Sequence, residues 1–143
     1  ILPVSAVLAD DEIMLTLQPG EHGSTYGGNP LACAVAITSL QVIVEEKMAE
    51  NAAVQGEYLR NGLEALHSPF IESVRGKGLL NAIVIRHADP QAAWTVCMEL
   101  KENGLLAKPT HGDKIRFAPP LTITKTQIDE CLEIIDDSLR ILK

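Results

Sequence analysis

Gly20-Glu21-His22-Gly23-Ser24-Thr25-Tyr26-Gly27-Gly28-Asn29-Pro30 is the most informative stretch of this 143-residue chain. Its glycines let the backbone adopt positive φ angles and let a ligand approach the main chain closely. Pro30 then opens a long apolar segment, as proline does at the first position of a helix. A glycine-rich loop with adjacent hydroxyls before a helix N-terminus is typical of an anion-binding site. Alternatively, the loop only turns the chain, and these features alone leave both interpretations open.

Composition excludes several classes of function. A formal charge of -7 without a basic cluster argues against nucleic-acid binding. The apolar run of residues 31–44 is shorter than the roughly 18 residues that a membrane span needs. No basic flank precedes the apolar N-terminus, so no signal peptide is predicted. We expect a globular protein.

The cysteines and histidines predict no metal site. Cys33, Cys97 and Cys131 are odd in number, far apart and set in apolar helical patterns, so we interpret them as reduced core thiols of an intracellular protein. The four histidines lack the spacing of metal ligands.

The first third of the chain predicts extended segments and one buried helix. Residues 2–8 and 13–17 favour short strands. Residues 31–44 are apolar on every side, so the helix expected there should be buried all round. The chain starts without methionine inside an apolar run, and we therefore expect it to be a fragment.

The rest of the chain, from about residue 45, predicts a small α+β domain. Thr124 and Gln127 form a capping-box signature for the last helix, and Asn51 and Asp89 are candidate N-caps of two earlier ones. Gly104 is an expected left-handed helix stop. The expected elements are helices over 51–66, 89–103 and 124–142, and strands over 70–75, 79–85, 105–108 and 114–117.

Arg116 is the second candidate for a functional residue. It lies on a short strand between apolar Ile115 and Phe117, so its side chain should point away from theirs. Its planar guanidinium suits a carboxylate. The alternative is an exposed strand arginine without a ligand, which sequence alone favours.

The motifs resemble those of a known family. HGSTYGGNP (22–30) looks like the loop of the class-III, fold-type-I, pyridoxal-phosphate-dependent ω-aminotransferases. RGKGLLNA (75–82), LLAKPTHGD (105–113) and IRFAPPL (115–121) are similar to later segments of that family in the same order. The last two resemble particularly the members that act on ornithine.

The resemblance implies an α/β fold: the C-terminal part of a fold-type-I transferase. Residues 1–44 would be the end of the large cofactor-binding domain, including the phosphate loop and a helix that crosses between domains. Residues 45–143 would be the small C-terminal α+β domain. A homodimer or higher homo-oligomer is implied, because the loop reaches the cofactor phosphate held by the neighbouring subunit.

The resemblance also assigns the site residues. Thr25, and less directly Ser24, would bind the phosphate of pyridoxal 5'-phosphate, and Arg116 would bind a substrate carboxylate. No catalytic residue is expected in this chain. The lysine that holds the cofactor lies upstream in the family, and neither Lys77 nor Lys108 has its context. We therefore expect the chain alone to be inactive.

The implied reaction moves the δ-amino group of L-ornithine to 2-oxoglutarate, giving glutamate-5-semialdehyde and glutamate, within arginine catabolism and proline biosynthesis. The alternatives are a related ω-aminotransferase that acts on acetylornithine or 4-aminobutyrate, or a small domain that binds partners without catalysis. The expected compartment is the mitochondrial matrix or the cytoplasm, with no nucleic-acid or membrane partner.

Overall fold

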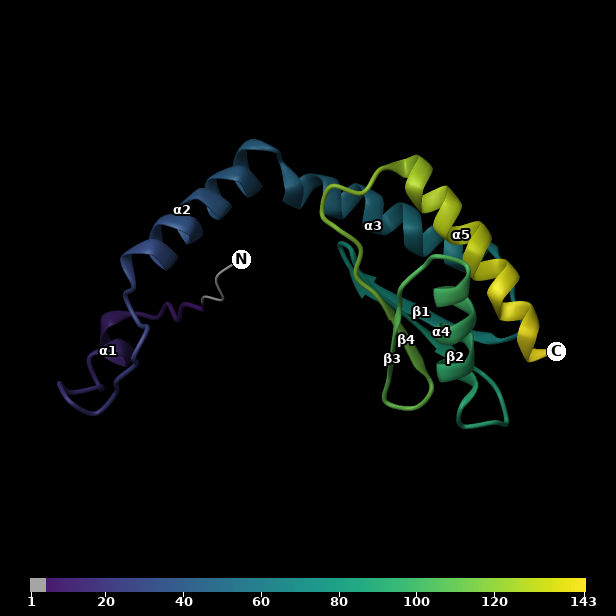
Figure 1. Cartoon of the computed structure of the whole chain (residues 1–143), viewed down its shortest axis with the longest axis horizontal. Helices are drawn as coiled ribbons and strands as arrows, with labels where there is room; N and C mark the ends of the chain where they lie inside the picture. Colours follow the sequence, from purple (N-terminus) through teal and green to yellow (C-terminus); the bar gives the residue numbers. More distant parts are fainter. Residues whose placement is uncertain (1–4) are drawn as a thin grey trace. The chain divides into compact units, whose positions relative to one another are not determined.

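The computed structural model describes residues 5–143. The chain divides into two compact units, Ile1–Glu46 and Lys47–Lys143. Figure 1 shows the elements of both units in chain order. Within the described residues, no helix is both long enough and apolar enough to cross a membrane.

The first unit contains two helices and no strand among its described residues. Helix α1 spans Asp11–Met14, and helix α2 spans Pro30–Glu45. The strand expected over 2–8 is wrong for residues 5–8, which form no regular structure, and its residues 2–4 lie outside the described part. The strand expected over 13–17 is also wrong: backbone N–H groups of Met14 and Leu15 donate to the carbonyls of Asp10 and Asp11. A strand needs a partner strand for its ladder, and this unit offers none among the residues described.

Helix α2 begins where the sequence predicts. Pro30 is at its first position, and the Asn29 side chain accepts a hydrogen bond of 3.0 Å from the Ala32 amide. Complete burial was the wrong expectation for this chain, because α2 has no buried residue and leaves Leu31, Leu40 and Val44 exposed. A helix that is apolar all round needs neighbours on every side, and α1 is only one turn long.

The second unit is a four-stranded antiparallel sheet in the order β1-β2-β4-β3, packed against helices. Figure 1 shows the sheet beside its helices. The strands are β1 (Ile71–Lys77), β2 (Leu80–Ile85), β3 (Lys108–Thr110) and β4 (Lys114–Phe117). The helices are α3 (Met48–Ala65), α4 (Ala92–Glu102) and α5 (Lys125–Leu139), followed by the short 3-10 helix η1 (Arg140–Leu142).

One apolar core joins the helices to one face of the sheet. Helix α3 packs on β1 and β2, α4 packs on β3 and β4, and α5 contacts both helices. The alternation of side chains along β4 follows the prediction: Ile115 and Phe117 are buried and Arg116 is exposed. The helical stripes are confirmed by the burial of Leu59, Leu63, Ala93, Val96, Cys97, Leu100, Ile128, Ile135 and Leu139.

Several element boundaries differ from the predicted ones. Asn51 is not an N-cap, because α3 begins at Met48 after Lys47 in the left-handed conformation. The side-chain amide of Asn51 instead donates to the carbonyls of Leu121 and Ile123. Helix α4 begins at Ala92, because Asp89 accepts a hydrogen bond from the Gln91 amide in a turn before the helix. Strand β3 begins at Lys108 rather than at residue 105.

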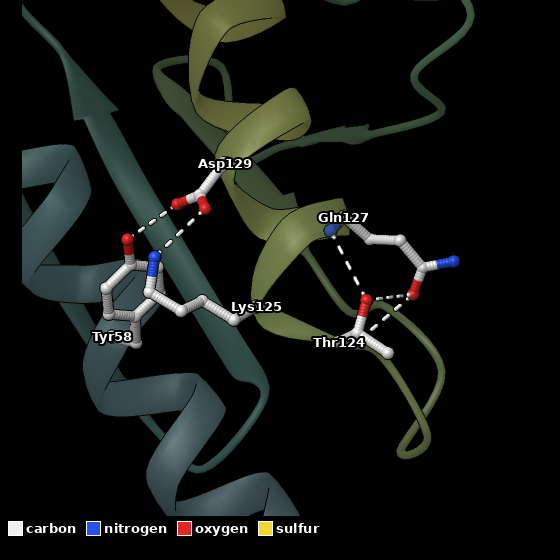
Figure 2. A network of polar contacts seen from close by, with 5 residues as sticks. All are labelled: Tyr58, Thr124, Lys125, Gln127 and Asp129. Atoms are coloured by element: carbon white, nitrogen blue, oxygen red, sulfur yellow. Dashed lines mark hydrogen bonds and ion pairs between the residues drawn. The ribbon is translucent and has the colours of Figure 1, made fainter.

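Two local predictions are confirmed. Gly104, just after α4, has φ +89, the left-handed conformation expected of a glycine stop. The capping box is complete, because Thr124 accepts from the Gln127 amide while the Gln127 side chain accepts from the Thr124 amide. Figure 2 shows this reciprocal pair at the start of α5.

Candidate functional site

The glycine loop before α2 is held by its own side chains. The Ser24 hydroxyl oxygen accepts a hydrogen bond of 2.9 Å from the Gly27 amide. A side chain on Gly27 would place its Cβ 3.0 Å from that of Ser24, so a glycine lets the loop close this tightly. Gly28 has φ +72 directly before the Asn29 cap. Ser24 therefore shapes the loop, and its contact with a phosphate stays a prediction.

Thr25 is the exposed hydroxyl of this loop. Among the described residues, its side chain takes part in no hydrogen bond, whereas the neighbouring Ser24 hydroxyl is engaged inside the loop. Tyr26, the next residue, is also exposed. An exposed hydroxyl on a tightly closed loop can donate to an anion without breaking a bond of the protein. The loop thus fits a phosphate group.

Arg116 lies on β4, one of the two inner strands of the sheet, between β2 and β3. It pairs with Ala82 on one side and with Lys108 on the other. Within residues 5–143 its guanidinium forms no salt bridge. Its neighbours Ile115 and Phe117 anchor the strand in the core, so the backbone that carries Arg116 is fixed while the guanidinium remains available. Thr25 belongs to the first unit and Arg116 to the second.

A buried polar cluster supports the sheet next to Arg116, and sequence reasoning missed it. Asn81 on β2 is 2% exposed, and Arg60 of α3 donates to its side-chain oxygen at 2.8 Å. Arg60 also donates to the Gly78 carbonyl at 2.9 Å, and the side-chain amide of Asn81 donates to that carbonyl at 3.1 Å. Because Asn81 pairs with Phe117, this cluster fixes β2 beside the strand of Arg116. The sequence signal that could have indicated this cluster is the polar Asn81 within the otherwise apolar strand β2.

The cysteines are free, but one is not in the core. Cys97 is buried, Cys131 is half-buried, and Cys33 on α2 is exposed, which corrects the expectation for Cys33. Burial raises the pKa of the Cys97 thiol to about 11 and also raises the pKa of Cys131. Both are therefore unreactive thiols near neutral pH. The described residues contain no group of three or more His, Cys, Asp or Glu side chains that could hold a metal ion.

Comparison with known proteins identifies the family. The chain belongs to the class-III aminotransferases, whose family model matches residues 2–139. This family depends on pyridoxal phosphate. The expected class is thus confirmed over nearly the whole chain.

Within that family the chain is a homologue of the ornithine aminotransferases. It is 60% identical over 139 residues to the mitochondrial ornithine aminotransferase of Rattus norvegicus, covering 97% of this chain and 32% of that protein. It matches the Plasmodium falciparum ornithine δ-aminotransferase structure with a TM-score of 0.88 and 46% identity, covering 94% of this chain and 35% of that one.

A solved acetylornithine aminotransferase is also similar. The enzyme from Elizabethkingia anophelis has a TM-score of 0.86 and 52% identity, covering 94% of this chain and 36% of that chain. The chain therefore spans about a third of the length of the proteins it matches. These matches confirm the expected α/β fold, that of the C-terminal portion of such enzymes.

Proposed function

We propose that this chain is the C-terminal part of an enzyme that transfers the δ-amino group of L-ornithine to 2-oxoglutarate, giving glutamate-5-semialdehyde and glutamate. The observation that carries the proposal is 60% identity to an ornithine aminotransferase over 97% of the chain. Its LLAKPTHGD and IRFAPPL segments fold into β3, β4 and the turn between them, the part of the sheet that carries Arg116.

Pyridoxal 5'-phosphate would supply the electron sink that makes amino-group transfer possible. The chain's own contribution to holding it is the loop of Ser24 and Thr25. Thr25 would donate its hydroxyl to the phosphate, and Ser24 would keep the loop closed through its bond with Gly27. The lysine that binds the cofactor covalently would lie outside this chain, so these 143 residues alone would not transaminate.

Arg116 would bind the substrate carboxylate. A guanidinium forms two parallel hydrogen bonds with a carboxylate, which orient the substrate as well as holding it. The fixed strand β4 supports this function, because the side chains on both sides of Arg116 are anchored in the core.

The proposed assembly is at least a homodimer, in which the phosphate loop of one subunit serves the site of its neighbour. The exposed apolar residues of the first unit support an extensive contact, since large exposed apolar patches mark interaction surfaces. We also propose the mitochondrial matrix as the compartment, because the rat and Drosophila melanogaster relatives are named mitochondrial.

A second candidate reaction is transfer from acetylornithine. The observation in its favour is the 52% identity to the solved acetylornithine aminotransferase of Elizabethkingia anophelis. Transfer from 4-aminobutyrate and a purely partner-binding domain have no comparable support.

The proposal is tested by changing Arg116 to Ala in the full-length enzyme. We expect binding of the carboxylate substrates to weaken by about 2–5 kcal/mol, because a carboxylate would lose its charged partner. Steady-state kinetics with ornithine and 2-oxoglutarate measure the effect. The matched control is Arg86→Ala, an exposed arginine just after β2. If Arg116→Ala behaves like the control toward both substrates, Arg116 does not belong to the site.

A further inference from the structure

The four strands of the second unit concentrate positive charge in an acidic protein. The whole chain has a formal charge of -7. Yet β1 to β4 contain a single carboxylate, Glu72, at the irregularity in β1. The cations on these strands are Arg75, Lys77, Lys108, Lys114 and Arg116. Such a separation of charge indicates a surface that faces anions.

The register of the sheet aligns three of these cations. Arg75 pairs with Ala82, Ala82 pairs with Arg116, and Arg116 pairs with Lys108. Residues directly opposite each other on neighbouring strands point to the same face of a sheet. Arg75, Arg116 and Lys108 therefore form one line across the sheet, interrupted only by the small Ala82. We call these three residues the cationic row.

The cationic row lies on the face of the sheet turned away from the core. Along β4 the alternate residues Ile115 and Phe117 are buried in the core that the helices share. Arg75, Lys108 and Arg116 are all exposed. The small side chain of Ala82 leaves space between the two arginines, so an anion can approach the centre of the row.

The charges of the row are not neutralised within the part of the chain that the structure describes. None of its three residues forms a salt bridge there, whereas Lys114, further along β4, is paired with Asp113. The hydrogen bond from Lys114 is the main cause that lowers the pKa of Asp113, and Arg75 contributes least. Like charges directly opposite on neighbouring strands destabilise a sheet. Lys108 beside Arg116 thus has a cost that a bound anion would remove.

We propose that the cationic row selects the dicarboxylate amino acceptor over the diamino donor, with Arg116 binding a carboxylate and Lys108 and Arg75 adding attraction from either side. The inference rests on the proposed function. 2-Oxoglutarate carries two negative charges, whereas ornithine has a net positive charge near neutral pH. A row of three cations therefore favours the dianion 2-oxoglutarate over the net positive ornithine. Lys108 and Arg75 are thereby specificity-determining residues for the acceptor half of the reaction.

The spacing of the strands supports different roles for Lys108 and Arg75. Neighbouring strands lie about 4.8 Å apart, so the Lys108 backbone is about 5 Å from that of Arg116 and the Arg75 backbone about 10 Å away. Lys108 is thus near enough to act on the carboxylate that Arg116 holds. The longer separation of Arg75 suits the second carboxylate of an extended dicarboxylate.

The test uses the full-length enzyme with Lys108→Gln and Arg75→Gln, and Lys101→Gln as the control for an exposed lysine on α4. Calorimetry measures the dissociation constant of glutarate, a dicarboxylate that cannot react. We expect each row variant to raise it by about 3- to 10-fold at low salt, and the difference to shrink as salt screens the charges. The control should bind glutarate like the unchanged enzyme.

Kinetics and thermal unfolding complete the test. The KM for 2-oxoglutarate should rise in the row variants, while the KM for ornithine should stay the same or fall. Unchanged glutarate binding overturns the proposal, and so does an equal rise in both KM values. Lower thermal stability with unchanged glutarate binding would instead mean that the row pairs with acidic groups of the protein. Because glutarate binding needs no turnover, it separates this proposal from the proposed reaction.

Discussion

At the scale of single residues, side chains of the same chemical type differ in the hydrogen bonds that they already form within the protein. Ser24 uses its hydroxyl inside the loop, whereas Thr25 has its hydroxyl outside the loop's own hydrogen bonds. Arg60 is engaged with Asn81 and Gly78 beneath the sheet, while Arg116 is exposed on its other face. Existing hydrogen bonds thus separate Arg60 from Arg116, while the Ser24 hydroxyl, which accepts inside the loop, keeps its O–H free to donate.

The first residue-scale prediction concerns Thr25→Ala in the full-length enzyme. Loss of one hydrogen bond to a charged phosphate should raise the dissociation constant of pyridoxal phosphate by roughly 10- to 100-fold. Reconstitution of the apoenzyme, followed by cofactor absorbance, measures the constant. Thr16→Ala is the control, because its hydroxyl donates only to the nearby Ile13 carbonyl. An unaltered constant in Thr25→Ala would mean that the loop only turns the chain.

The second residue-scale prediction concerns Tyr58, which joins α3 to α5. Its hydroxyl donates to Asp129 at 2.5 Å, and the Lys125 ammonium lies 4.5 Å from the centre of its ring. Figure 2 shows these three side chains together. Tyr58→Phe keeps the ring but removes the hydrogen bond, so unfolding should require about 1 kcal/mol less free energy. Denaturant unfolding measures this difference.

The contribution of Tyr58 should also depend on pH. The hydrogen bond from Tyr58, and then the one from Lys125, lowers the pKa of Asp129 below its ordinary 3.8. Because folding lowers this pKa, the ionised Asp129 carboxylate stabilises the fold at pH values above its ordinary pKa. This stabilisation is lost as the pH falls through the lowered pKa. The difference between Tyr58→Phe and the unchanged protein should therefore shrink below about pH 4. A constant difference down to pH 2 would contradict the assigned bond.

At the scale of elements, the turn between β1 and β2 is positioned by close contact between its backbone and that of helix α3. A Cβ on Gly56 of α3 would lie 1.8 Å from the Gly78 carbonyl oxygen. Only a glycine permits this contact. The same carbonyl accepts from Arg60 and Asn81, so α3 and the turn form one fixed body.

This contact predicts that Gly56→Ala destabilises the second unit. Overpacking against rigid backbone should cost about 1–3 kcal/mol, more than the gain in helix propensity from alanine. The control is Gly62→Ala on the same helix, where the new Cβ would meet the flexible end of Leu132. Denaturant unfolding should show the larger loss for Gly56→Ala. Equal losses would indicate that α3 and the turn are not pressed together.

The elements also show what sequence can and cannot predict. The helices and strands of the second unit follow from local periodicity, because each apolar stripe has a core within the same unit to pack on. The strands expected over 2–8 and 13–17 fail, because an apolar run becomes a strand only beside a partner. The start of α3 was missed because Lys47 adopts a left-handed conformation that lysine seldom takes.

The same distinction holds for the candidate site. Arg116 and its orientation were predictable from alternation along β4. The register that sets Lys108 opposite Arg116 and the burial of Asn81 were not, because both depend on how the strands and helices pack together. The contacts of Thr25 and Ser24 with phosphate, and the division at residue 44, stay predictions.

At the scale of the whole molecule, the first unit behaves as a part that needs neighbours. Its helix α2 is apolar on all sides and has no buried residue. The second unit, in contrast, has a continuous core of its own. This asymmetry agrees with the proposed role of the first unit in a larger, at least dimeric enzyme.

The most direct measurement is a comparison of amino donors with the full-length enzyme and 2-oxoglutarate. We predict that kcat/KM for L-ornithine exceeds that for N-acetylornithine and 4-aminobutyrate by at least about tenfold, equivalent to roughly 1.4 kcal/mol of transition-state binding. Formation of glutamate-5-semialdehyde identifies the transfer of the δ-amino group. A higher kcat/KM for N-acetylornithine, or no transfer from ornithine, would contradict the proposed function.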